Sequence, residues 1–319
     1  MPLGEFEVIA KYFSRDAKRA ALGVGDDCAL LHVATSMQLA VSTDMLVEGR
    51  HFLSTVAPAN LGHKALAVNL SDLAACGAQP LAFTLALALP RVDEQFLDGF
   101  SEGLWALADR HDCELVGGDT TQGPLNICIT VIGQVPRGQA LLRSGARAGD
   151  DLYVSGLLGD ARLALEVFRG HTELAASDLC RVRQAMERPE PRVALGMALR
   201  GVATSAIDVS DGLLGDLSHI LARSGVGAEL RVDAVPRSPD VDALPQNLQH
   251  EYLLAGGDDY ELLFTAPPAH REQVLAASAA VHLPVTCIGR IQAAHGIRLL
   301  DRQGHRLADT FKSFDHFRS

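Results

Sequence analysis

Two neighbouring segments, each apolar on more than one side, place the strongest constraint on the fold. Residues 59–76 form a predicted helix that is apolar nearly all round, and Gly77 and Pro80 follow as stop signals. Residues 81–89, LAFTLALAL, alternate large and small apolar residues, which suits a strand packed on both faces. Since both elements need cover, they predict a layered fold of the α/β or α+β class.

Strands and helices alternate on both sides of this pair. A short amphipathic helix is expected over 5–13, followed by a possible hairpin with strands at 28–33 and 37–42. A helix is predicted over 93–110, between strands 81–89 and 113–116. The later expected strands are 125–135, 152–155, 204–208, 228–233, 260–265 and 285–291, and the later helices are 159–169, 176–186, 191–200, 212–224 and 268–280.

Residues 136–150, PRGQALLRSGARAGD, interrupt this alternation with three arginines and three glycines and little apolar periodicity. A chain of 319 residues has room for roughly two domains. We therefore predict an N-terminal domain over 1–137 and a C-terminal domain over 148–319, joined by a linker at about 138–147.

The charge balance limits the partners. The net charge is −11, which argues against a nucleic acid or an anionic membrane as the main partner. The six cysteines occur singly, the N-terminus has no secretory pattern, and no apolar run is long enough to span a membrane. We expect a cytoplasmic enzyme or binding protein with reduced thiols.

Aspartate recurs among small residues and at the ends of predicted strands, whereas Walker-type loops, hydrolase elbows, zinc helices and protein-kinase motifs are absent from the sequence. Each aspartate motif alone has a structural alternative, as a turn or as a helix cap. The motifs are GDD at 25–27, STD at 42–44, NLSD at 69–72, GGD at 117–119, DVSDG at 208–212 and GGDD at 256–259.

Asp72 is the most informative of these residues, because it lies inside the apolar helix with Asn69 one turn before it and no arginine in that helix. A buried carboxylate is costly unless it is paired or binds a metal, and we slightly favour the metal. Oxygen ligands without a histidine or cysteine cluster suit Mg²⁺, and several such carboxylates indicate phosphoryl transfer.

Three further residues each have two possible roles. Arg143 is a phosphate contact or a solvated linker arginine, and His51 is a substrate contact or a structural histidine. Ser210 is a helix N-cap, a ligand group where a strand meets a helix, or both.

Taken in order, these motifs resemble the thiamine-monophosphate kinase family. They read GVGDDCALL, VSTDMLVEGRHF, AVNLSDLAACGAQP, LVGGDTTQGP, LLRSGARAGD, AIDVSDGLLGDL, AGGDDYELLFT and a terminal FDHF, and the likeness runs from residue 4 to residue 317. The family is related to aminoimidazole ribonucleotide synthetase and selenophosphate synthetase. The resemblance implies two α/β domains and a homodimer in which N-terminal strands close a shared β-barrel. It also implies ATP-dependent phosphorylation of thiamine monophosphate to thiamine diphosphate with several Mg²⁺ ions.

The resemblance also implies roles for individual residues. Asp72, Arg143 and Asp211 would act in catalysis, and His51, Asp258 and Phe314 would contact thiamine monophosphate. At position 258 many relatives have a glutamate, and at position 314 they often have a tyrosine or tryptophan, where this sequence has Asp258 and Phe314. Asp26 would hold a turn or contact a water molecule. The nucleotide contacts implied are Gly118, Asp119, Arg143 and Ser210, and the metal ligands implied are Asp27, Ser42, Thr43, Asp44, Asp72, Asp119, Asp208 and Asp211.

The chemistry agrees with the motifs, because a phosphate oxygen that is already anionic needs no general base to attack a phosphoryl group. Two alternatives stay open. One is a sister enzyme that phosphorylates an amide or carboxyl oxygen or selenide. The other is a non-catalytic regulator that binds magnesium and nucleotide.

Overall fold

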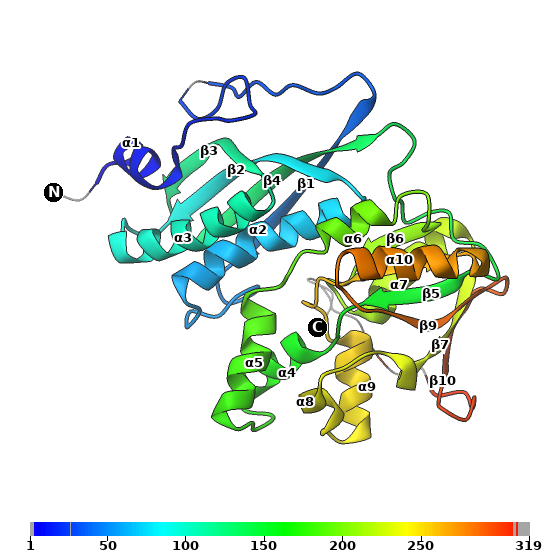
Figure 1. Ribbon diagram of the computed structural model, residues 1–319. Coiled ribbons are helices and arrows are strands. Elements are labelled where there is room, and N and C mark those ends of the chain that lie inside the picture. The colour runs from blue at the N-terminus through cyan, green and yellow to red at the C-terminus, as the bar shows by residue number, and fades with distance from the viewer. Residues whose placement is uncertain (1–2, 26, 309–310, 312–319) are drawn as a thin grey trace. The chain divides into compact units, whose positions relative to one another are not determined.

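The computed structural model describes residues 3–25, 27–308 and 311, and its contacts divide the chain into two units (Figure 1). The first unit contains residues 1–73 and 78–138, and the second contains 74–77 and 139–319. Residues 139–147, most of the predicted linker, therefore group with the second unit. The predicted domain limits at 137 and 148 stay a prediction.

A four-stranded sheet is the framework of the first unit. Its strands are β1 (Met37–Val47), β2 (Gln79–Leu89), β3 (Glu114–Gln122) and β4 (Asn126–Pro136), in the order β1-β4-β2-β3. The β1–β4 and β4–β2 pairs are antiparallel, and β2–β3 is parallel. β1 and β3 are therefore the edge strands, and both carry predicted site residues.

The helices of the first unit are α2 (Pro58–Ala75) and α3 (Glu94–Arg110), together with a short α1 (Glu5–Val8) that continues as the π-helical turn η1 (Ile9–Phe13). Figure 1 shows α2 and α3 along the same face of the sheet. Asp93 caps α3 by accepting the Phe96 N–H at 3.2 Å. The core between helices and sheet includes Leu66, Leu70, Phe83 and Phe100, all with essentially no exposed surface.

Trp105 fastens the N-terminal segment to α3. Its indole Nε1 donates to the carbonyl oxygen of Tyr12 at 2.9 Å, and the Arg15 guanidinium lies 3.9 Å from the centre of the indole ring. Tyr12 and Phe13 are buried beside it.

A six-stranded sheet is the framework of the second unit, in the order β10-β7-β9-β5-β8-β6. The strands are β5 (Asp151–Ser155), β6 (Ser205–Asp208), β7 (Gly227–Arg231), β8 (Leu262–Ala266), β9 (Val285–Gln292) and β10 (Gly296–Leu300). Every residue of β5, β6 and β8 is buried, so both faces of this part of the sheet are covered.

Seven α-helices and two 3₁₀ turns are described in this unit. They are α4 (Asp160–Phe168), α5 (Ala176–Glu187), α6 (Val193–Ala198), α7 (Leu213–Ser224), η2 (Val232–Ala234), α8 (Pro239–Asp242), α9 (Gln246–Ala255), η3 (Pro268–His270) and α10 (Arg271–Ala280). Across the described residues, no helix has the length and apolar character needed to cross a bilayer.

The predicted strand at 28–33 is wrong. These residues form a single bridge, between Leu30 and Leu22, and Leu30 is exposed. The apolar run resembles a strand, but within the described residues no strand of either sheet pairs with it. In contrast, β1 continues to Val47 and β3 to Gln122, well past their predicted ends, and α8, α9 and β10 were not anticipated.

Candidate active site

The first group of predicted site residues lies where edge strand β1 faces α2. The Ser42 hydroxyl donates to Oδ2 of Asp72, a contact between two candidate metal ligands that are 30 positions apart. The backbone N–H of Asp44 donates to Oδ1 of Asn69 at 3.0 Å, and Asn69 Nδ2 donates to the Ala65 carbonyl at 3.0 Å. Asn69 therefore ties the strand to the helix, which gives a role to a residue that was only noted as a neighbour of Asp72.

Thr43 points the other way, as expected for the middle residue of three along a strand. Its hydroxyl lies 2.8 Å from that of Thr130 on β4, so the Thr43 side chain is not brought to Asp72. Asp72 itself is half-buried rather than sealed in the interior as predicted, because its carboxylate extends to Ser42 at the edge of the sheet.

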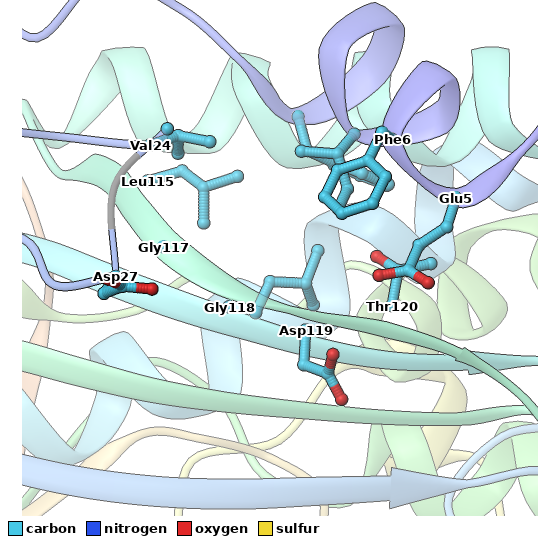
Figure 2. Close-up of a pocket in the computed structure, with 13 residues that line it drawn as sticks. Glu5, Phe6, Val24, Asp27, Leu115, Gly117, Gly118, Asp119 and Thr120 are labelled. Atoms are coloured by element: carbon cyan, nitrogen blue, oxygen red, sulfur yellow. The ribbon is translucent and has the colours of Figure 1, made fainter.

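A second group surrounds a pocket of about 420 Å³ beside edge strand β3. Figure 2 shows the Phe6 ring of α1 above the strand and the carboxylates of Asp27 and Asp119 below. Asp27 and Asp119 are both exposed. The apolar lining residues are Phe6, Ile9, Phe13, Val24, Leu85 and Leu115.

Gly118 lets the strand run close to β2 at this pocket. A Cβ atom at this position would lie 1.9 Å from the Leu85 carbonyl oxygen, and the backbone φ is +150°. A side chain larger than hydrogen therefore requires the strand to shift away from β2.

His51 follows β1 in a turn. Its Nδ1 accepts the Val47 N–H at 2.9 Å, so the main chain fixes both the tautomer and the orientation of the imidazole.

The second unit gathers carboxylates between β6 and α7. Asp208 ends β6 and is 5% exposed, and Asp216 on α7 is 3% exposed. Asp216 Oδ2 accepts the N–H groups of Ser210 at 3.0 Å and Asp211 at 3.1 Å. The N-cap prediction for Ser210 is wrong, because Gly212 occupies the cap position and Asp216 supplies the acceptor.

Asp216 lies among the predicted site residues but was not predicted to be one of them, although it lies in the quoted AIDVSDGLLGDL motif. Burial, followed by the negative charges of Asp208 and Asp211, raises the pKa of Asp216 to about 8. Negative charge concentrated in this way favours a bound cation.

The GGDD turn lies against this group. The Asp258 N–H donates to the Ser210 carbonyl at 2.7 Å, which brings two predicted site residues together. The next carboxylate, Asp259, accepts the Gly159 N–H at 2.9 Å, and burial raises the pKa of Asp259 well above its usual range.

Arg143 lies on a loop held by Ser224. The Ser224 hydroxyl donates to the Arg143 carbonyl at 3.2 Å and accepts the N–H groups of Gly145 at 3.1 Å and Ala146 at 3.2 Å. The Arg143 residue is exposed. The predicted residues Asp26 and Phe314 lie outside the described residues.

The candidate ligands suit a hard cation, because their donor atoms are all oxygens. Within the described part of the chain, however, no three His, Cys, Asp or Glu side chains lie close enough to hold a metal ion by themselves.

Models of two protein families match the chain. The AIR synthase related protein N-terminal domain covers residues 25–135, and the corresponding C-terminal domain covers residues 147–302. These matches and the fold define an AIR synthase-related protein with two α/β domains, which confirms this part of the predicted fold class, while the shared β-barrel of a dimer stays a prediction.

Similar proteins show which family within this class the chain belongs to. The thiamine-monophosphate kinase of Salmonella typhimurium is 45% identical over 326 residues, covering 99% of each chain. The crystal structure of thiamine-monophosphate kinase from Stenotrophomonas maltophilia is 45% identical, with a TM-score of 0.84 over 92% of this chain and 94% of that one. The structure of AaThiL complexed with AMPPCP and TMP is 31% identical, with a TM-score of 0.78 over 90% and 89% of the chains. The chain belongs to the thiamine-monophosphate kinase family, which confirms the resemblance predicted from its motifs.

Proposed function

We propose that this chain is a thiamine-phosphate kinase, which transfers the γ-phosphoryl group of ATP to thiamine monophosphate and forms thiamine diphosphate. The observation that carries the proposal is the 45% identity to a thiamine-monophosphate kinase over 99% of both chains. The 31% identical relative that holds AMPPCP and TMP adds support, because AMPPCP is an analogue of ATP.

In this reaction an oxygen of the acceptor phosphate forms a new bond to the γ-phosphorus as the bond to the bridging oxygen of ADP breaks. The attacking oxygen is already anionic, so no proton has to be removed from it. The protein has to align the acceptor phosphate with the γ-phosphate of ATP and offset the repulsion between them.

The pocket beside β3 is suited to the nucleotide. Its apolar side, with Phe6 and Leu115, fits a purine ring, and its acidic side, with Asp27 and Asp119, fits metal-bound phosphates. Gly118 leaves main chain exposed at this point. We place further nucleotide contacts on Ser210 and Arg143, which would offset phosphate charge.

Magnesium would be held mainly by aspartate carboxylates, and it would neutralise phosphate oxygens when bound. Ligation by one or two carboxylates per ion, completed by water and substrate phosphate, is usual for Mg²⁺ and agrees with the absence of three-carboxylate groups among the described residues. The proposed ligands are Asp27, Ser42, Thr43, Asp44, Asp72, Asp119, Asp208 and Asp211.

We place the acceptor against His51, Asp258 and Phe314. A carboxylate and an aromatic ring suit a cationic heteroaromatic substrate, and the histidine suits its phosphate. Asp258 is one methylene shorter than the glutamate of many relatives, so its reach depends on where its turn is held.

A homodimer is proposed from edge strand β1. Leu39, Val41 and Met45 on this strand are 49%, 62% and 52% exposed. A long edge strand with an apolar exposed row is suited to pairing with another copy and to completing a barrel. A cytoplasmic location fits six free cysteines.

The test of the proposed function is to incubate the purified chain with ATP, Mg²⁺ and thiamine monophosphate and to measure thiamine diphosphate. We expect product that depends on all three additions. Nucleotide binding without product would favour the regulator, and turnover only with an amide, a carboxylate or selenide as acceptor would favour a sister enzyme.

A further inference from the structure

A buried ion pair lies next to the GGDD turn and has no role in the proposed chemistry. Glu261 is 4% exposed, and its carboxylate accepts the Arg192 Nε–H at 2.8 Å and the Ser155 hydroxyl at 2.5 Å. Arg192 Nη2 also donates to Glu261 Oε1. Ser155 in turn accepts the Leu262 N–H at 2.9 Å. The carboxylate is therefore held from two sides, by a guanidinium and by a hydroxyl.

Gly156 makes room for this carboxylate. Its φ is +56°, and a Cβ atom here would lie 2.0 Å from Glu261 Oε1. The loop after β5 thus fits closely around the ion pair, which limits the ways in which Glu261 can be placed.

The turn that precedes Glu261 is strained. Asp258 has φ +64° and Tyr260 has φ +52°, which are two of the four described non-glycine residues with positive φ. Such conformations cost free energy and persist where the surroundings fix them from several sides.

Main-chain hydrogen bonds hold both ends of this turn against the segment after β6. The Tyr260 N–H donates to the Val209 carbonyl at 2.8 Å, and the Val209 N–H donates to the Glu261 carbonyl at 2.8 Å. The Asp258 N–H donates to the Ser210 carbonyl at 2.7 Å. The position of Asp258 therefore depends on where the main chain of Glu261 is fixed.

We propose that Glu261, fixed by Arg192 and Ser155, is a positioning residue that holds Asp258 in its strained conformation toward the acceptor substrate. This inference rests on the proposed function, in which Asp258 contacts thiamine monophosphate. A buried ion pair contributes little net stability compared with apolar packing, whereas removing one partner leaves the other charge uncompensated. In this protein the Glu261–Arg192 ion pair fixes one geometry of the turn.

The test compares Glu261→Gln with a matched control, Asp151→Asn. Asp151 is also a buried carboxylate, on the same strand as Ser155, and it accepts from Arg271 Nε at 2.6 Å and Nη2 at 3.0 Å. For Glu261→Gln we expect the KM for thiamine monophosphate to rise about tenfold, because a displaced contact weakens binding, while the KM for ATP stays within about twofold. Asp151→Asn leaves both KM values unchanged.

A milder variant keeps the inference testable if Glu261→Gln fails to fold. Ser155→Ala removes one hydroxyl and leaves the ion pair, so the KM for thiamine monophosphate should rise by about twofold to threefold, within the range for one lost hydrogen bond. Because both residues act through the same turn, the double variant should be no worse than Glu261→Gln alone.

Two results would overturn the inference. One is an unchanged KM for thiamine monophosphate in both variants, and the other is a parallel rise of both KM values, as expected from a purely structural defect. Failure of the proposed function is separate, because then the unaltered chain makes no thiamine diphosphate from the start.

Discussion

The acidic groups of the two units resemble each other in sequence but differ in their surroundings. In the first unit, Asp27 and Asp119 are exposed, and Asp72 is half-buried with a serine hydroxyl as donor. In the second unit, Asp208 and Asp216 are buried, and burial with neighbouring negative charges raises the pKa of Asp216 to about 8. In the first unit, a hydrogen bond between a strand and a helix therefore fixes Asp72, whereas the carboxylates of the second unit concentrate negative charge that favours a cation.

This difference means that aspartates in similar motifs should respond differently to substitution and to pH. Carboxylates of the first unit can be neutralised with little effect on stability, because water or a hydroxyl already solvates them. Neutralising a buried carboxylate in the second unit relieves repulsion in the metal-free protein.

The largest effect is expected for Asp72→Asn in the first unit. Turnover should fall by at least about 10²-fold, since charge that stabilises the transferring phosphoryl group is lost, while the thermal unfolding midpoint stays nearly the same. Steady-state kinetics and circular dichroism measure the two quantities. Asp109→Asn, an exposed aspartate on α3 paired with Arg15, is the control. Full turnover by Asp72→Asn at ordinary Mg²⁺ would contradict the metal role.

A smaller effect is expected for Gly118→Ala at the nucleotide pocket. The added methyl group collides with the Leu85 carbonyl, so β3 must shift, with a loss of about 1–3 kcal/mol in stability and about tenfold in ATP affinity. Gly117→Ala is the matched control, because its nearest neighbour would be Thr84 Cγ2 at 3.9 Å. Calorimetry with AMPPCP measures the affinity. Equal losses in the two variants would show that the close approach at Gly118 is unimportant.

A third prediction is a pH dependence of the unfolding free energy of the metal-free protein, measured by urea unfolding in the presence of a chelator. Asp216 has a folded-state pKa of about 8, above the unfolded value of about 3.9, so the folded state binds the extra proton between these limits. Its contribution to stability is complete below pH 4 and is lost as pH rises toward 8, by at most about 1.4 kcal/mol per pH unit.

Asp216→Asn should reduce this slope, because Asp259, whose pKa burial also raises, still contributes to it, and added Mg²⁺ should reduce it in the unaltered chain. A stability that stays constant from about pH 5 to pH 8 without Mg²⁺ would contradict the predicted charge concentration.

Much of the fold was predictable where the apolar pattern was strong. α2 and β2 lie close to their predicted limits, because each is apolar on several sides and has few alternative structures. The run at 28–33 misled the prediction, since strand formation requires a partner that the local sequence does not reveal. β3 extends through two glycines of low strand propensity because parallel pairing with β2 outweighs that propensity.

The candidate site was predictable as a set of motifs but not as a set of contacts. The Ser42–Asp72 contact joins residues 30 positions apart, and the Asp258–Ser210 bond joins residues farther apart still. Asp216 was missed because its sequence environment on α7 is that of an ordinary amphipathic helix. Its charge acquires a role only when the segment before the helix folds back over it.

The attachment of the N-terminal segment to Trp105 gives the protein a built-in optical probe. The sequence has a single tryptophan, and its indole donates a hydrogen bond to the main chain of Tyr12. Tyr12 belongs to the same N-terminal segment as Phe6, which lines the pocket. The intrinsic emission of this one indole should therefore report, without any label, whether the segment stays docked on α3 as nucleotide enters.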